Sequence, residues 1–423
     1  MGREEVELLI ENAGEVVTLR GGSQKPLLGE QMKNLGIIRN GSVAANEGKI
    51  VAVGKTREIR GKFEAKETVD ADGKVVMPGF VDPHTHLVFA GSREEEFEMR
   101  IQGSTYMEIL ERGEGILKTV RETRKASRDE LLESCKKTLD TMLEHGTTTV
   151  EAKSGYGLTT MDEVKCLEAM KVLNEKHPID VVPTFLGAHA IPLEYRNNPD
   201  GYVGLMINEM IPEVASRRLA EFCDVFCEKG VFDIRQSRKI LSKGKEQGLT
   251  PKLHADEMTR LGGAELAAEV EAISASHLLF ASVDGLKAMA KQGVAAILLP
   301  GASFSLMTGK YADARKMISW GMPVALGTDY NPSCWIESQQ IVIALACHQM
   351  HMIQSEAITA ATINAAHAIN RAQTVGSLEA GKKADIAVLS APNHNFLGYR
   401  IGTNLVDKVV KDGKLVVDEG KAI

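Results

Sequence analysis

The chain has 423 residues, with ordinary hydrophobic (43%) and charged (25%) fractions and a formal net charge of −7 at pH 7. This length exceeds that of one small domain and allows a large core with a smaller appended unit. The acidic balance argues against a nucleic-acid partner, and the lack of any apolar run of about 18 residues argues against a membrane-spanning segment.

The N-terminal sequence, MGREEVELLI, is acidic and lacks the basic start and the apolar stretch of a signal peptide. The six cysteines are scattered, without the C-x-x-C spacing of metal sites, and this usage suits a reducing compartment. We therefore expect a cytoplasmic protein.

Both ends of the chain predict short β-strands separated by glycine-containing turns. In the N-terminal part, hairpin turns are expected at Asn40-Gly41 and Asp72-Gly73, and in the C-terminal part at Asp412-Gly413. The expected strands are residues 6–10, 15–19, 41–44, 49–54, 69–76, 384–389, 405–411 and 414–417. We predict that residues 1–76 and 377–423 form one small β-sandwich domain built from both termini, beside a central domain over residues 77–376.

The central region alternates strands with helices. Two helix starts are predicted from the capping boxes Ser127-x-x-Glu130 and Thr160-x-x-Glu163. Eight apolar strands are expected at residues 75–81, 147–152, 180–186, 224–227, 251–254, 272–277, 295–299 and 323–327. This pattern predicts an α/β fold with a (β/α)₈ barrel of the TIM type. An open doubly wound sheet is the alternative, but it calls for a glycine-rich phosphate loop after an early strand, and the sequence has none.

Polar side chains gather at the C-terminal ends of the predicted strands, which ring one mouth of such a barrel. They are His84, His86, Tyr156, His189, His254, Glu257, His277, Asp329 and Asn331. The other six histidines, at positions 145, 177, 348, 351, 367 and 394, fall in predicted helices or loops. We expect those six to be structural.

His84 and His86 lie two residues apart at the end of the first barrel strand, so their side chains share one face. With His254 and Asp329 they form a donor set that suits zinc or iron and leaves room for a water whose pKa falls toward 7. Asp329 could also accept a proton from that water. The alternatives are two buried histidines bonded to backbone and an Asp329 that caps the next segment.

Glu257 follows His254 by three residues and is placed to donate a proton or a hydrogen bond to a ring nitrogen of a substrate. Alternatively, it is a surface carboxylate that caps a helical region over residues 259–271.

The pattern Pro78-Gly-x-x-Asp-x-His-Thr-His86, with a later histidine at a strand end, another histidine and an aspartate, resembles the amidohydrolase superfamily. Within it, the chain is most similar to the imidazolonepropionase family. The segments that carry this resemblance are DPHTHLVFAGSREEEFEMR (82–100), VEAKSGYGL (150–158), TFLGAHAIPLEY (184–195), KLHADE (252–257), SASHL (274–278), LLPGASFSL (298–306) and ALGTDYNP (325–332).

The resemblance implies a hydrolase that opens the ring of 4-imidazolone-5-propanoate to give N-formimidoyl-L-glutamate, in the third step of histidine degradation, with one zinc or iron ion per subunit. It assigns the metal ligands to His84, His86, His254 and Asp329, and the proton-transfer or water-positioning roles to Glu257, His277 and Asp329. It assigns substrate binding to Arg93, Tyr156, His189, Glu257, Asn331, Ser333 and Cys334. Arg93 would hold the propanoate carboxylate, unless it pairs instead with Glu94, Glu95 or Glu96.

The sequence departs from the family pattern at three positions. Ser333 stands where the family usually has a glycine after the proline, which could crowd a contact with the product. Ser276 stands where the family commonly has an aspartate before the histidine. Lys153 follows the second strand, whereas the metal-bridging lysine of some superfamily members comes from the fourth, so one metal ion is expected here.

Two other functions remain open from the sequence. One is a different amidohydrolase, such as an aminohydrolase of a heterocyclic ring, which would release ammonia and for which a carboxylate clamp at Arg93 is not expected. The other is a non-catalytic relative, which generally loses metal ligands, whereas all are present here. We expect a homodimer, as is ordinary for an enzyme of this size.

Overall fold

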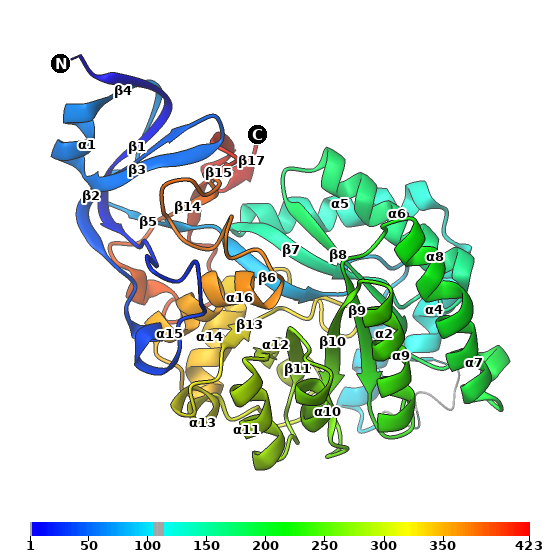
Figure 1. The fold of residues 1–423 in the computed structure, drawn as a ribbon. Coiled ribbons are helices and arrows are strands. Elements are labelled where there is room, and N and C mark those ends of the chain that lie inside the picture. Colours follow the sequence, from blue (N-terminus) through cyan, green and yellow to red (C-terminus); the bar gives the residue numbers. More distant parts are fainter. Residues whose placement is uncertain (1, 105–107, 109–113) are drawn as a thin grey trace.

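The computed structural model describes residues 2–104, 108 and 114–423, and it contains two separate sheets (Figure 1). One of them, the barrel sheet, has eight parallel strands paired in chain order, as predicted. They are β6 (Phe80–Thr85), β7 (Thr147–Lys153), β8 (Asp180–Ala188), β9 (Phe222–Cys227), β10 (Thr250–Ala255), β11 (Ser274–His277), β12 (Ala295–Leu298) and β13 (Val324–Leu326).

The barrel closes between its first strand and the residues that follow its last. The Asp329 N–H donates to the His84 carbonyl at 3.0 Å, and the His86 N–H donates to the Tyr330 carbonyl at 2.8 Å. The Asp82 carboxylate accepts from both the backbone N–H and the hydroxyl of Thr328 across the same junction. These bonds bring the ends of β6 and β13 together, so side chains 245 positions apart (84 to 329) become neighbours.

Helices alternate with these strands and surround the barrel (Figure 1). They are α2 (Glu94–Ile101), α4 (Ile116–Lys125), α5 (Arg128–Glu144), α6 (Thr160–Lys176), α7 (Pro199–Leu205), α8 (Ile211–Ser216), α9 (Ile234–Glu246), α10 (Gly263–Glu269), α11 (Val283–Gln292), α12 (Pro300–Ser305), α13 (Ala314–Ser319), α14 (Gln339–Met350), α15 (Gln354–Ala360) and α16 (Ile363–Ala368). Short 3-10 or π turns are η1 (Gly29–Lys33), η2 (Leu193–Tyr195), η3 (Met206–Met210) and η4 (His394–Phe396). Within the described ranges, no helix is both long and apolar enough to cross a membrane.

One of the two predicted capping boxes is confirmed. The Ser127 hydroxyl accepts from the Glu130 N–H, and the Glu130 carboxylate accepts from the Ser127 N–H. The other prediction was wrong, because Thr159, not Thr160, caps α6. Glu163 is instead buried and accepts backbone N–H groups of the loop at residues 155–158.

The second sheet is mixed and draws on both termini, which confirms the composite arrangement (Figure 1). Its strands are β1 (Glu4–Val16), β2 (Ile38–Asn46), β3 (Lys49–Lys55), β4 (Phe63–Asp70), β5 (Val75–Pro78), β14 (Ile386–Leu389), β15 (Val406–Lys411), β16 (Lys414–Asp418) and β17 (Lys421–Ala422), with helix α1 (Thr56–Lys62) between β3 and β4. A hydrophobic cluster joins Leu8, Val43 and Ile50 to Ile386 and Val410, so the two ends of the chain share one core.

The expected strand over residues 75–81 is two strands. Residues 75–78 form β5 in the terminal sheet, and the chain enters the barrel after Gly79. Any Cβ at Gly79 would lie 2.4 Å from the Thr148 side chain, so this crossing needs glycine. The barrel strand therefore starts and ends later than predicted, and it contains His84.

Two of the three predicted hairpin turns were wrong. Asn40-Gly41 lies inside β2, and the turn between β2 and β3 is Glu47-Gly48, where both φ angles are positive. Asp72-Gly73 is a tight turn between β4 and β5, but both strands pair in parallel with β1 and not with each other. Asp412-Gly413 does connect the antiparallel pair β15 and β16, as expected.

Candidate metal centre and substrate cavity

A cavity of about 600 Å³ opens at the C-terminal ends of the barrel strands. The sequence-predicted site residues that line it are His86, Arg93, Tyr156, His189, His254, Glu257, His277, Asp329, Asn331, Ser333 and Cys334. His84, the remaining one, is completely buried beside His86 and His254. The barrel therefore brings all of the sequence-predicted site residues together.

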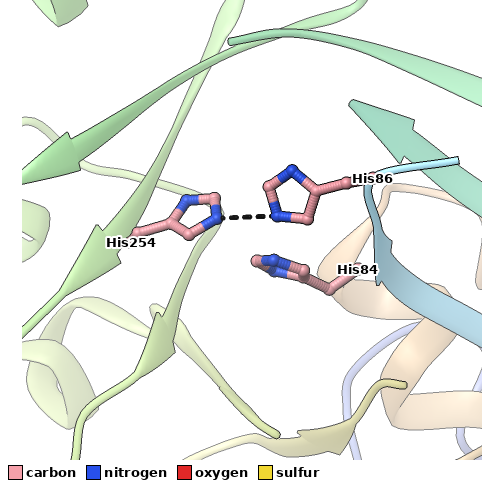
Figure 2. A group of neighbouring side chains, drawn as sticks. All are labelled: His84, His86 and His254. Carbon is pink, nitrogen blue, oxygen red and sulfur yellow. Dashed lines mark hydrogen bonds between the residues drawn. The ribbon is translucent and has the colours of Figure 1, made fainter. Parts of the chain in front are cut away.

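Three histidine side chains, two of which line the cavity, point toward one another from two strands of the barrel (Figure 2). His84 comes from β6, His86 follows that strand immediately, and His254 lies in β10. The Nε2 atoms of His86 and His254 are 3.3 Å apart, and the Asp329 Oδ1 lies 3.4 Å from the Nε2 atoms of both His84 and His86. The possible ligand atoms of His84, His86 and His254 thus form one close group, and those of His84, His277 and Asp329 form a second that shares His84.

These donors fit a metal ion. The Nε2 of His84 and the Oδ1 of Asp329 are buried and have no hydrogen-bond partner in the described part of the chain. Burial lowers the pKa of both His84 and His86 well below that of a free histidine, so their rings are neutral and can offer a lone pair. Unpaired nitrogen and oxygen atoms at this spacing are costly without a cation and favourable with one.

Further side chains orient two of the histidines from behind. The His254 Nδ1 lies 3.1 Å from the Asp224 carboxylate. Burial alone would raise the pKa of Asp224, but Lys153 and His254 hold it well below its usual value, so the carboxylate accepts and Nδ1–H donates. This tautomer leaves the lone pair on Nε2, facing the other ligands. On the other side, the His84 Nδ1 is 2.8 Å from the Ser276 hydroxyl, so this serine also supports a histidine.

Asp224 belongs to a buried ionic cluster inside the barrel that the sequence analysis missed. Lys153 Nζ lies 2.8 Å from Asp224 and 2.6 Å from Glu151, and Lys252 Nζ lies 3.0 Å from Glu151. All four side chains are shielded from solvent. The available signal was a charged residue in the middle of an otherwise apolar strand, as in FCDVFC and TPKLHA. We refer to these four residues as the core charge cluster.

Glu257 and His277 face each other on the cavity wall, with Glu257 Oε2 3.5 Å from His277 Nε2. Burial, followed by the Asp329 and Glu228 carboxylates, raises the pKa of Glu257 to about 8. Burial lowers the pKa of His277 to about 3. At neutral pH this contact joins a protonated acid to a neutral imidazole and is not an ion pair.

The backbone on either side of Glu257 is fixed by two buried carboxylates. Glu228 accepts the N–H groups of Met258 and Thr259, and Asp256 accepts the N–H of Ala264 at the start of α10. Asp256, not Glu257, therefore holds the start of the following helix, and the alternative of a capping role for Glu257 is wrong. His277 and Asp329 both have positive φ angles (71° and 52°), a strained conformation that is concentrated at functional sites.

Arg93 precedes α2 and is only 7% exposed. Its nearest acids are engaged elsewhere: Glu95 pairs with Lys118, and Glu96 accepts the Gly115 N–H. The Nε of Arg93 has no partner among the described residues. This N–H donor is therefore available to an anion in the cavity that Arg93 lines.

The remaining predicted residues shape the walls. The rings of His86 and His189 stack with centroids 4.6 Å apart, and the Tyr156 ring lies 5.1 Å from that of His189. Asn331 uses its side chain in the turn after β13, where its oxygen accepts the N–H groups of Ser333 and Cys334. This turn presents both residues to the cavity. The six histidines expected to be structural do lie in helices, at helix ends or in the η4 turn.

Comparison with known proteins agrees with this geometry. Two models of the amidohydrolase family match residues 67–105 and 245–416. A protein of Alkaliphilus metalliredigens named imidazolonepropionase is 52% identical over 99% of this chain and 100% of its own length. One of Geobacillus kaustophilus with the same name is 55% identical over 98% of this chain and 99% of its own.

Among solved structures, a zinc-bound adenosine deaminase from Xanthomonas campestris covers 100% of this chain and 95% of its own, with a TM-score of 0.74 at 19% identity, which shows the shared fold. The full-length identity to proteins of one name, above half of all positions, is decisive for membership. The chain belongs to the amidohydrolase family and, within it, to the imidazolonepropionases.

Proposed function

We propose that the protein hydrolyses 4-imidazolone-5-propanoate to N-formimidoyl-L-glutamate, in the third step of histidine degradation, with one zinc or iron ion per subunit. The observation that carries the proposal is that one cavity combines a metal donor set with a buried arginine, Arg93, whose Nε has no partner among the described residues. The name shared by its full-length relatives supports the same substrate.

His84, His86, His254 and Asp329 would hold the ion. Three imidazoles and a carboxylate suit either zinc or iron, and the adenosine deaminase of the same fold contains zinc. When bound, the ion lowers the pKa of a water molecule and polarises the carbonyl group of the ring.

The protein side chains divide the proton transfers of ring opening between them. Asp329 accepts a proton from the attacking water while the oxygen of that water adds to the ring carbonyl carbon. Glu257, which is protonated at neutral pH, donates a proton to the ring nitrogen as the amide C–N bond breaks. His277 is neutral and contacts Glu257, so it can orient the water or the carbonyl oxygen without adding charge.

The direct test follows loss of imidazolone absorbance with purified, metal-loaded protein. We expect turnover of 4-imidazolone-5-propanoate without release of ammonia. Turnover of another heterocycle with ammonia as a product, and none of the imidazolone, would favour an aminohydrolase instead. A metal-loaded protein with no hydrolytic activity on any of these rings would contradict the proposal.

Replacing Arg93 with methionine is expected to raise KM about 10- to 100-fold with a smaller change in kcat. The reason is the loss of a charge-assisted contact to the propanoate carboxylate, worth about 1.5–3 kcal/mol. Steady-state kinetics measures this, with Arg121→Met in α4 as a control for removal of a positive charge. An unchanged KM in Arg93→Met would exclude the clamp.

Replacing Asp224 with asparagine is expected to weaken metal binding about 10- to 100-fold, because the ionised partner that fixes the His254 tautomer is lost. Competition against a chromogenic chelator gives the metal dissociation constant without an activity assay. A variant that binds metal as tightly as the wild type would show that Asp224 does not support the site.

We also propose a homodimer that works in the cytoplasm. All six cysteines are free thiols, which suits a reducing compartment. Ile353 and Tyr399 are 45% and 74% exposed and border one groove, and such apolar surface is typical of a subunit contact. Light scattering coupled to size exclusion would show a mass near twice 45.9 kDa; a single-chain mass would refute the dimer.

A further inference from the structure

A second arginine, Arg100, lies on the same cavity wall as Arg93. Arg93 immediately precedes α2, and Arg100 lies near the end of that helix, seven positions later. Seven residues correspond to about two helical turns, so the two side chains leave the same side of α2. Both arginines line the cavity that contains the candidate metal centre.

Arg100 is only partly exposed, and its Nε is shielded from solvent without a hydrogen-bond partner among the described residues. The Nε of Arg93 is in the same state. A buried donor without an acceptor is unfavourable, so two such donors on one wall favour a ligand that brings acceptors. Burial lowers the pKa of Arg100 from its usual value. The nearby Glu96 carboxylate opposes this shift, and the positive charge of Arg93 adds to it.

The charge on this wall matches a single carboxylate. Between the two arginines, Glu96 is buried and supplies one negative charge, while the exposed Glu95 pairs with Lys118. Two guanidinium groups and the one buried carboxylate leave one positive charge. A third cationic side chain that lines the cavity, Lys310, already has a partner of its own. Its Nζ lies 3.4 Å from the centre of the Phe280 ring, in a cation–π contact.

We propose that Arg93 and Arg100 form a two-arginine subsite that holds the carboxylate of the substrate's propanoate chain between them. This inference rests on the proposed function for the identity of the substrate. Arg100 thereby becomes a specificity residue: it selects ligands that carry a carboxylate at the end of the chain and contributes little to binding of the ring.

The test measures equilibrium binding, so it does not depend on turnover. Isothermal titration calorimetry on metal-loaded protein would compare 3-(imidazol-4-yl)propanoate with its uncharged amide. For Arg100→Met we expect the propanoate to bind about 10- to 100-fold more weakly, as for loss of one charged hydrogen-bonding partner, and the amide within about twofold of the wild type. Arg100→Lys should lie between, because lysine restores the charge but not the planar fork.

Lys310→Met is the matched control, because it removes a cation from the same cavity that has its own aromatic partner. It should change binding of the propanoate by no more than about twofold. Equal weakening of propanoate and amide in Arg100→Met, no weakening of either, or an equal loss of propanoate binding in Lys310→Met would overturn the subsite. Should Arg100→Met fail to fold, Arg100→Lys carries the same comparison.

Failure of the proposed function gives a different result. In that case wild-type protein does not turn over the imidazolone, whereas the propanoate and amide still differ in their dependence on Arg100. The selective loss of the propanoate would then identify a carboxylate subsite for another substrate.

Discussion

Replacing His254 with alanine is expected to abolish metal retention and to lower kcat/KM by at least about 10³-fold. His254 is the only proposed ligand from β10, and Asp224 would be left facing a cavity in place of the imidazole. A catalytic metal contributes several kcal/mol of transition-state stabilisation, and each 1.36 kcal/mol corresponds to about a factor of ten in rate. Metal analysis after dialysis, together with kinetics, measures both effects.

The matched control is His348→Ala, which removes a histidine from α14 that bonds only to the Gly398 carbonyl among the described residues. We expect this variant to retain its metal and its rate. An His254→Ala protein that keeps one equivalent of metal and most of its activity would show that the ion is held elsewhere.

Replacing Lys153 with methionine is expected to lower the free energy of unfolding by about 3–5 kcal/mol. The change removes one positive charge from the core charge cluster. It leaves the Asp224 carboxylate without a lysine partner inside the barrel and Glu151 with Lys252 alone. Urea denaturation followed by circular dichroism gives the value, provided that the transition is two-state.

Lys137→Met removes a lysine of α5 that pairs with Glu133 on the surface, where both side chains are more than 70% exposed. Such a pair contributes about 0–1 kcal/mol, so this control should unfold almost as the wild type does. If Lys153→Met and Lys137→Met had similar stabilities, the cluster would not contribute in the way we expect. The double variant Lys153→Met/Asp224→Asn should lose less free energy of unfolding than the sum of the losses in the two single variants, because the two charges interact.

The barrel and most of the site residues could be predicted from the sequence, whereas features that depend on distant contacts could not. The barrel strands are buried on both faces and therefore stand out as apolar runs, and the polar residues just after them converge by the geometry of the barrel. His84, His86, His254 and Asp329 could be found in this way without coordinates. Arg93, which lines the cavity, was indicated by the resemblance to the family and not by the strand pattern.

Features that depend on distant contacts could not be predicted. The division of residues 75–81 into two strands follows from the close approach of Gly79 to Thr148, which no local pattern reveals. Asn40-Gly41 has a typical turn sequence, but its neighbours pair with β1 and keep it inside a strand. Glu163 matches a capping box, yet the loop at residues 155–158 offers it more N–H donors.

The position of Asp329 beside His84 has a consequence for biosynthesis. The two residues face each other only because the residues after β13 pair with β6 and close the barrel. The complete ligand set for the ion therefore does not exist in a nascent chain that has not yet been synthesised as far as Asp329. The metal must then bind late, after nearly four-fifths of the chain has been translated. The bound cation would link β6 to the residues that follow β13 and so stabilise the closure of the barrel. Without the ion, local opening should occur first between β6 and the residues after β13. Faster amide hydrogen exchange at Asp329 and Tyr330 would report it.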